Sequence, residues 1–274
     1  MAMRGKPDVV LLDVMLPDID GFQVIERLRE ERSTAQIPII IISARGRTGD
    51  KVRALRLGGD DYLVKPFDAM ELGARVESVL KRREREIEAS PTTRLPGSPA
   101  LERECERRLQ EGQDFVLCYL DLDNLKAFND YYGYAKADGV IQQAGDIIRK
   151  AVERHGDGSD LVSHIAGDDF VIVTQQPRLR AIAAEVIGTF DRLIPMYYAE
   201  SDRERGYIEA EDRFGERRRF PLMSISLAAV KVRRGAFRSH AEVSARAAEL
   251  KKSAKAIPGS VLVVGDERGE EVIR

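Results

Sequence analysis

Short apolar runs alternate with helical stretches over residues 1–67, and this alternation constrains the fold more than any other feature. The apolar runs lie at residues 9–12, 37–42 and 62–64. The stretches between them, residues 21–31 and 48–57, have the apolar spacing of helices. Such alternation predicts a parallel sheet with crossover helices, the α/β class. Each run ends at a polar or turn residue, so we expect a functional edge at the carboxyl ends of the strands.

A different pattern follows this segment. Apolar residues recur among many charges over residues 68–88, which predicts one long amphipathic helix. Residues 90–99 then contain three prolines and Gly97, a composition that ends a helix and marks a domain boundary. We therefore expect three segments, which are residues 1–67, a connector over 68–89, and a second domain over 90–274.

The second domain is predicted to be α+β. Helical spacing at 100–110 precedes an apolar strand at 115–120, and a hairpin centred on 166–169 has apolar strands on both sides. Alternation together with a hairpin predicts a mostly antiparallel central sheet with flanking helices. Later strands are expected at 207–210, 217–220, 222–232 and 261–264, and later helices at 179–194 and 241–256.

Charge and cysteine content narrow the choice of partners. Lys plus Arg total 44 and Asp plus Glu total 46. Because the charges nearly balance, the net charge does not indicate nucleic acid or a membrane as the partner. The first apolar run is too short for a signal peptide or a membrane span, and we expect a soluble, cytoplasmic protein. Cys105 and Cys118 lack metal-ligand spacing and are predicted to be reduced and structural. His155, His164 and His240 also lack ligand spacing and are assigned no role.

The polar residues at the first strand ends belong to longer motifs. Asp13 is followed by MLPDIDGF at 15–22, Ser43 ends the next run, and GGDDYLVKPF occupies 58–67. In this order the motifs resemble the receiver domain of response regulators, which has a flavodoxin-like parallel sheet. The resemblance implies that Asp13 is the phosphoacceptor, that Ser43 and Lys65 contact the phosphoryl group, and that a sensor histidine kinase is a candidate partner.

Only twelve residues precede Asp13, whereas a receiver has two strands and two helices before its phosphoacceptor. We therefore expect a truncated receiver whose first strands are missing and whose sheet has an unpaired apolar edge. Asp13 without the acidic pair of the first strand is a poor Mg²⁺ site, because Mg²⁺ needs several oxygen ligands. A dimerisation or packing role is favoured over phosphorylation.

Two carboxylates of the second domain are predicted to meet at one edge of its sheet. Asp121 ends an apolar strand, and Asp168 follows Gly167 in a tight turn between two strands. Neighbouring strands can bring both carboxylates together, where they can hold Mg²⁺ and leave positions for phosphate oxygens. Asn129 and Asp138, predicted on a helix and in the loop after it, can pair with the donor and acceptor edge of guanine.

These residues lie in blocks that resemble the GGDEF domain of diguanylate cyclases, a fold of the nucleotidyl-cyclase type. The blocks are PTTRLPG at 91–97, DLDNLKAFND at 121–130 and AGDDF at 166–170. The resemblance implies a homodimer that condenses two GTP molecules to cyclic di-GMP with Mg²⁺. The implied roles are metal binding by Asp121, Asp168 and the Leu122 carbonyl, catalysis by Asp168, Asp169 and Lys126, and nucleotide binding by Asn129, Asp138, Gly167 and Lys255.

Four positions depart from the family pattern. Ala166 replaces the first glycine of the signature, Asp169 is one methylene shorter than the usual glutamate, and Gly259 stands in place of an arginine. The product-inhibition motif reads DGSD at 157–160 without its arginine, so feedback through it is not expected.

Two functions stay open at this point. One is a diguanylate cyclase of low turnover, and the other is a degenerate GGDEF domain that binds GTP or another guanine nucleotide and signals through protein contacts. Synthesis of a mixed purine dinucleotide is disfavoured, because both guanine-contacting residues are present.

A set of basic residues in the second half of the chain suggests a phosphate-attracting patch or a solvated surface. The set comprises Arg217, Arg218, Arg219, Lys231, Arg233 and Arg234. We favour solvated hairpin positions balanced by Glu209, Glu211 and Asp212, because exposed ion pairs of this kind are common and contribute little.

Overall fold

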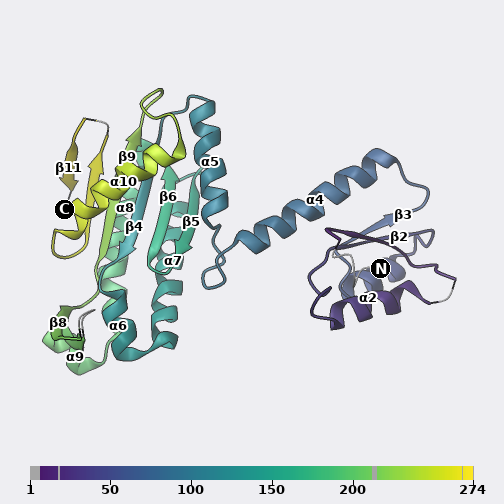
Figure 1. Ribbon diagram of the computed structural model, residues 1–274, viewed down its shortest axis with the longest axis horizontal. Helices are drawn as coiled ribbons and strands as arrows, with labels where there is room; N and C mark the ends of the chain where they lie inside the picture. Colours follow the sequence, from purple (N-terminus) through teal and green to yellow (C-terminus); the bar gives the residue numbers. More distant parts are fainter. Residues whose placement is uncertain (1–6, 18, 212–214, 267, 274) are drawn as a thin grey trace. The chain divides into compact units, whose positions relative to one another are not determined.

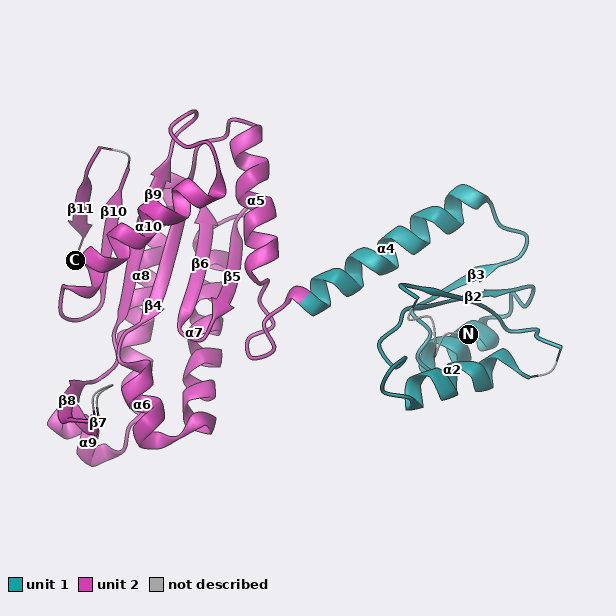
Figure 2. Ribbon diagram, in the orientation of Figure 1, with its two compact units in different colours: residues 1–87 teal, residues 88–274 magenta. Residues whose placement is uncertain are grey.

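The computed structural model describes residues 7–17, 19–211, 215–266 and 268–273. The chain divides into two compact units, Met1–Ile87 and Glu88–Arg274 (Figure 2). Each unit has its own sheet and core. No helix within the described ranges combines the length and the apolar character needed to cross a lipid bilayer.

Unit 1 contains a three-stranded parallel sheet, which confirms the fold predicted from the apolar runs (Figure 1). Its elements are β1 (Val10–Asp13), α2 (Gly21–Glu30), β2 (Ile39–Ser43), α3 (Thr48–Arg56), β3 (Asp61–Val64) and α4 (Ala69–Glu88), of which the last residue, Glu88, belongs to unit 2. The strand order is β1-β2-β3, so β1 is an edge strand within the described residues. Ile39 and Ile41 of β2 are fully buried in one core with Phe22 of α2, whereas Leu11 of β1 is 46% exposed. The sheet therefore presents an apolar side chain to solvent at its β1 edge.

Unit 2 is built on a six-stranded sheet in the order β11-β10-β9-β4-β6-β5. The strands are β4 (Phe115–Leu122), β5 (Leu161–Ala166), β6 (Asp169–Thr174), β9 (Ile225–Val232), β10 (Val261–Gly265) and β11 (Glu270–Ile273). All neighbours are antiparallel except β9 and β10. This arrangement confirms the predicted α+β fold with a mostly antiparallel sheet, although β11 was not anticipated.

Helices cover both faces of this sheet (Figure 1). The helices are α5 (Ser98–Gln110), α6 (Leu125–Tyr132), α7 (Tyr134–His155), α8 (Gln176–Leu193) and α10 (His240–Lys255). Successive side chains of a strand point to opposite faces. Leu117 of β4 accordingly joins the core beneath α5 and α10, while Cys118 joins the core beneath α6, α7 and α8. Cys105 and Cys118 are both buried and unpaired, and burial raises the pKa of each thiol to about 12.

A small two-stranded sheet of unit 2 packs against α6. It consists of β7 (Tyr207–Glu211) and β8 (Arg217–Pro221), and the connection from α8 to β7 contains η1 (Ile194–Tyr197) and α9 (Glu200–Arg205). The hydroxyl of Tyr132, the last residue of α6, donates to the buried carboxylate of Asp202 and accepts from the Ala199 N–H at 3.0 Å. These bonds attach the α9 segment to the helix that carries Asn129. The hairpin formed by β7 and β8, called here the β7–β8 hairpin, follows this segment and packs against the same helix.

Helix α10 begins with a side-chain cap that predicts a measurable stability effect. The Ser239 hydroxyl accepts from the Glu242 N–H at 3.3 Å, and the Glu242 carboxylate accepts from the Arg238 N–H at 2.8 Å. Replacing a capping serine by alanine costs about 1 kcal/mol. We expect Ser239→Ala to lower the free energy of unfolding by about this amount in urea titrations, with Lys252→Ala, at an exposed position of the same helix, as the control. An unchanged unfolding midpoint in Ser239→Ala would contradict the cap.

Candidate nucleotide and metal site

Three carboxylates meet at the carboxyl end of β4. Asp121 lies in β4 directly opposite Asp169 of β6, and Asp168 lies in the turn between β5 and β6. One oxygen from each of the three carboxylates lies within 4.8 Å of the others. Gly167 has a φ of 55° in the same turn, a conformation that glycine adopts without a steric cost. The structure thus brings Asp121 and Asp168 together as predicted, and it adds Asp169 to the cluster.

Two lysines of α10 contact this acidic cluster. Lys251 Nζ lies 2.6 Å from Asp121 Oδ2 and also contacts Asp169 Oδ1, while Lys255 Nζ lies 2.7 Å from Asp121 Oδ1. The lysines are four residues apart and therefore lie on one face of the helix. Lys251 was missed in the sequence analysis, although its spacing from Lys255 was a signal that could have revealed it.

The charges of the cluster are strongly linked. Burial disfavours ionisation of Asp121, but contacts with Lys251 and Lys255 outweigh it and lower the pKa of Asp121. Burial raises the pKa of Asp169 despite its contact with Lys251. Burial acts to lower the pKa of Lys251, but Asp121 and Asp169 reverse this effect and raise it. The cluster therefore holds Asp121 ionised beside a protonated Lys251.

Asp123 lies two residues after Asp121 but takes no part in the cluster. Its Oδ2 accepts from the hydroxyls of Ser224 and Ser226, each at 2.8 Å. Burial raises the pKa of this carboxyl, and the two serine hydroxyls only partly offset the effect. Asp123 therefore offers a matched control for substitutions at Asp121.

A cavity of about 550 Å³ adjoins the cluster. Its lining residues are Leu122, Asn124, Leu125, Lys126, Ala127, Asp130, Asp168, Glu211, Phe220 and Lys255. Lys126, to which the resemblance gave a catalytic role, and Lys255, to which it gave a nucleotide-binding role, thus share one cavity with Asp168. Glu211 and Phe220 come from the β7–β8 hairpin and were not anticipated, because nothing in the local sequence indicates that this hairpin packs against α6.

The two residues predicted to recognise guanine lie on neighbouring helices. Asn129 is in α6, and its Oδ1 atom is buried with no hydrogen-bond partner among the described residues. Asp138 is exposed and lies in α7, so its predicted position in a loop was wrong. The loop prediction failed because Gly133 alone separates the two helices. Neither residue lines the cavity described above.

Two protein-family models match the chain, one within each unit. The family model of the response regulator receiver domain matches residues 1–77, and that of the GGDEF domain of diguanylate cyclases matches residues 91–205. The chain carries a response regulator receiver domain followed by a GGDEF domain. The β7–β8 hairpin lies beyond the matched part of the GGDEF domain.

Curated relatives and solved structures each resemble part of the chain. The transcriptional regulator RpaA of Synechocystis is 36% identical over 135 residues, which are 48% of this chain and 56% of RpaA. The transcriptional activator protein IrlR of Burkholderia pseudomallei is 55% identical over 75 residues, which are 27% of this chain and 31% of IrlR. The chain thus spans about a third to just over half the length of these curated relatives.

Two solved structures each match one part of the chain. The GGDEF domain of DgcB from Caulobacter crescentus, solved with cyclic di-GMP, has a TM-score of 0.47 and 18% identity, covering 66% of this chain and 96% of that chain. A response regulator structure from Chloroflexus aurantiacus has a TM-score of 0.29 and 37% identity, covering 30% of this chain and 66% of that chain.

The receiver domain places its predicted phosphoacceptor beside the predicted lysine. Lys65 Nζ lies 2.6 Å from Asp13 Oδ2, and the Met15 N–H donates to Asp13 Oδ1 at 2.9 Å. The hydrogen bond from Lys65 lowers the pKa of Asp13. Ser43 is buried, and its hydroxyl accepts from the Arg45 N–H at 3.1 Å. The structure thus brings Asp13 and Lys65 into contact. The Ser43 hydroxyl instead forms a hydrogen bond with the loop that follows β2.

Residues 157–160 stand where the GGDEF family has its product-inhibition motif. Both aspartates of this loop form ion pairs with an arginine of the same domain. Arg178 of α8 contacts the carboxylate of Asp157 and lies 3.1 Å from Asp160 Oδ2. The Asp160 carboxylate also accepts from the Asp157 N–H at 2.7 Å. Both carboxylates are therefore already engaged by groups of the same domain.

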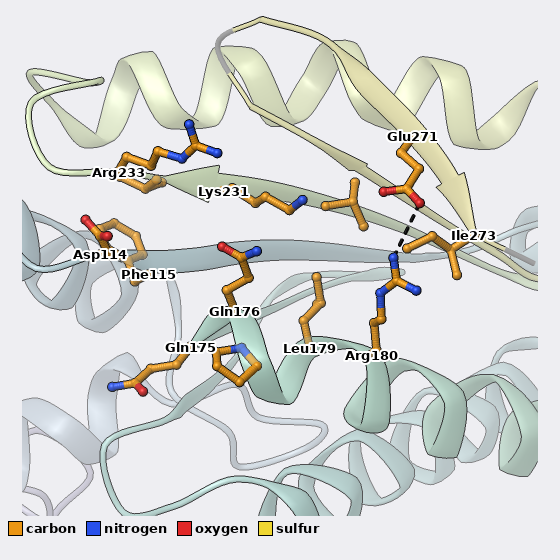
Figure 3. Close-up of a pocket in the computed structure, with 13 residues that line it drawn as sticks. Asp114, Phe115, Gln175, Gln176, Leu179, Arg180, Lys231, Arg233, Glu271 and Ile273 are labelled. Carbon is orange, nitrogen blue, oxygen red and sulfur yellow. Dashed lines mark hydrogen bonds and ion pairs between the residues drawn. The ribbon is translucent and has the colours of Figure 1, made fainter.

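The basic residues of the second half of the chain do not form one patch. Lys231 and Arg233 line a second cavity of about 680 Å³ near the start of β4, at the opposite end of the sheet from Asp121 (Figure 3). Arg219 of β8 instead pairs with Glu209 at 3.2 Å, which confirms the predicted balance at that hairpin position. Asp212, the third predicted acidic partner, lies outside the described residues.

Proposed function

We propose that the GGDEF domain binds GTP with Mg²⁺ and, in a homodimer, condenses two GTP molecules to cyclic di-GMP at a low rate. The observation that carries the proposal is the meeting of three carboxylates with Lys251 and Lys255 at one end of the sheet. Carboxylate and carbonyl oxygens are the ligands that Mg²⁺ prefers. Asp121 and Asp168, with the Leu122 carbonyl, are the residues that would hold it, and the ion would neutralise charge on the phosphates.

The other residues of the site supply binding and proton transfer. Lys126 and Lys255, which share the cavity with Asp168, would pair with the triphosphate near Gly167. Asn129 and Asp138 would recognise guanine, and the unpartnered Oδ1 of Asn129 supports a ligand-directed role. Asp169 would assist removal of the 3'-hydroxyl proton. The deprotonated 3'-oxygen of each GTP would attack the α-phosphorus of the other, forming a P–O bond and releasing pyrophosphate.

Three features account for a low rate. The carboxylate of Asp169 is about 1.5 Å shorter in reach than that of glutamate. Ala166 adds a methyl group beside the turn where a phosphate must approach closely. Lys251 already occupies Asp121 and Asp169, so an incoming cation must displace its ammonium group.

Incubation of the purified chain with GTP and Mg²⁺, followed by chromatographic separation of nucleotides, tests the proposal. We expect cyclic di-GMP to accumulate slowly in the wild type and to be absent with Asp168→Ala. The proposed cyclase activity fails if the wild type forms no cyclic di-GMP, whether or not it binds GTP.

A binding module is the second candidate function. The contacts of Lys251 with both Asp121 and Asp169 favour it, because a fixed ammonium group can substitute for a metal ion in neutralising these carboxylates. In this case the domain would hold GTP or another guanine nucleotide and signal by contact with a partner protein. Tight GTP binding in calorimetry without product would identify this function.

Removal of the Lys251 ammonium group is expected to strengthen metal binding. Lys251→Met removes the ammonium group that contacts Asp169 and leaves Asp121 with Lys255 as its counter-charge. Mn²⁺ should therefore bind about tenfold more tightly in titration calorimetry, a difference of about 1.4 kcal/mol. Lys252→Met, at the adjacent exposed position, is the matched control and should leave the affinity unchanged. Weaker Mn²⁺ binding in Lys251→Met would show that the lysine supports the site in another way.

For the receiver domain, residues 1–67, we propose dimerisation or packing, with residues 68–89 as connector to the GGDEF domain over 90–274. The apolar side chain of Leu11, which is 46% exposed in the edge strand β1, supports this role over phosphorylation by a sensor histidine kinase. Because the proposed substrate GTP is a cytoplasmic metabolite, we also propose a cytoplasmic location.

A further inference from the structure

His164 of β5 is buried and uses both of its ring nitrogens. Nδ1 lies 2.7 Å from the Ser90 hydroxyl and 3.0 Å from the Thr93 hydroxyl. Nε2 lies 3.0 Å from the carbonyl oxygen of Gly167, in the turn that carries Asp168. From the sequence this histidine was assigned no role, because it lacks ligand spacing, and its partners Ser90 and Thr93 are more than 70 residues away in the chain.

The partners determine which nitrogen carries the proton. A carbonyl oxygen only accepts hydrogen bonds, so Nε2 must donate to Gly167. Nδ1 of the neutral ring is then the acceptor, and the Ser90 and Thr93 hydroxyls are the donors. Burial lowers the pKa of His164, which agrees with a neutral ring. The His164 ring also stacks on the Phe170 ring, with centroids 4.4 Å apart and planes inclined by 13°. The hydrogen bonds of both nitrogens and this stacking contact together determine the orientation of the imidazole.

The segment that contacts Nδ1 is itself firmly held in unit 2. The Ser90 N–H donates to the Leu95 carbonyl at 2.8 Å, and the Arg94 N–H donates back to the Ser90 carbonyl at 2.8 Å. The His164 N–H donates to the Pro96 carbonyl at 2.9 Å, which ties this turn to β5. This turn, residues 90–96, directly follows α4, whose last residue, Glu88, forms an ion pair with Arg103 of α5 at 2.5 Å.

We propose that His164 is a positioning residue that links the turn after α4 to the turn between β5 and β6, which carries Asp168. By fixing the Gly167 carbonyl, the imidazole orients the turn that presents Asp168 and Asp169. The imidazole also accepts hydrogen bonds from the Ser90 and Thr93 hydroxyls. The orientation of the turn that carries Asp168 therefore depends on the position of residues 90–96, which follow α4. A displacement at the end of α4 is therefore transmitted to the acidic cluster through one side chain.

Hydrogen exchange of the full-length chain tests the contact with Gly167. Glutamine can place its amide N–H near the position of Nε2, whereas asparagine reaches only the position of Nδ1. We expect His164→Asn to speed amide exchange in residues 166–169 about tenfold, as expected for loss of one buried hydrogen bond. His164→Gln should restore most of the protection. His155→Asn, a half-buried histidine of α7, is the control and should have no effect on this turn. Equal exchange in the wild type and His164→Asn would overturn the proposal.

The link to the turn after α4 needs a separate variant. Ser90→Ala combined with Thr93→Val removes both hydroxyl donors and leaves the Nε2 contact in place. We expect exchange in residues 166–169 to rise by several-fold in this double variant, although no substituted atom touches the turn. An unchanged rate would show that His164 acts locally and transmits nothing from the connector.

Activity gives the second readout, and it rests on the proposed function. His164→Asn should lower kcat for cyclic di-GMP formation about tenfold with little change in KM, because it displaces Asp168 and Asp169 rather than the phosphate-binding lysines. His164→Gln should recover most of kcat. If the wild type forms no product, the proposed cyclase activity fails while the exchange experiments still decide the role of His164. A larger effect on KM than on kcat would contradict the positioning role.

Discussion

Replacing Asp121 by asparagine is expected to lower the rate of cyclic di-GMP formation by about 10²–10³-fold, the usual cost of losing one preorganised charged group at a reaction centre. Asp121 is the buried member of the acidic cluster, and it contacts both Lys251 and Lys255. Asparagine has nearly the same shape but carries no charge. The variant should therefore lose Mg²⁺ binding and leave two lysines without their shared counter-charge. Initial rates with saturating GTP and Mg²⁺, together with Mn²⁺ titration calorimetry, measure the two effects.

Asp123→Asn is the matched control for this experiment. Asp123 is equally close to the end of β4, but its carboxylate is held by Ser224 and Ser226 and lies outside the acidic cluster. We expect its rate to stay within a few-fold of the wild type. Equal losses in the two variants would mean that stability of the strand end, and not metal binding, explains the result. Circular dichroism melting of both variants separates these cases.

Lengthening Asp169 to glutamate is expected to have the largest effect in the opposite direction. A misplacement of about 1 Å can cost 10²-fold in rate, and Asp169→Glu restores the missing methylene. We therefore expect kcat to rise by about 10- to 100-fold, with a further gain when Ala166→Gly is added. Steady-state assays of pyrophosphate release and of cyclic di-GMP give the rates independently.

Asp114→Glu supplies the control for a longer side chain. Asp114 lies just before β4, at the far end of this strand from the acidic cluster, and accepts from the Arg234 N–H at 2.8 Å. This substitution should not change turnover. If turnover falls in Asp169→Glu, the aspartate is the side-chain length that the contact with Lys251 requires, and restoring glutamate does not restore catalysis. Such a result would favour the binding module over the cyclase.

Much of the fold could be predicted because the relevant patterns are local. Apolar spacing along each strand and helix determines which face can be buried, so the parallel sheet of the receiver domain and the antiparallel sheet of the GGDEF domain both followed from it. The position of Asp121 at the end of an apolar strand, and of Asp168 beside a turn glycine, also predicted that they meet. Helix ends were less certain, and Asp138 lies in α7 rather than in a loop because a single glycine separates two helices.

The remaining features depend on packing between distant segments. Lys251 and Asp169 are 82 positions apart, and His164 and Ser90 are 74 positions apart, so no local pattern links either pair. The packing of the β7–β8 hairpin on α6 likewise brings Glu211 and Phe220 into the cavity beside Asp168. The sequence by itself determined the elements and the carboxylates at the strand end, because secondary structure and burial follow from residue spacing. Only the tertiary structure decided which lysines neutralise those carboxylates and which histidine holds their turn, because these contacts depend on how helices and hairpins pack across the sheet.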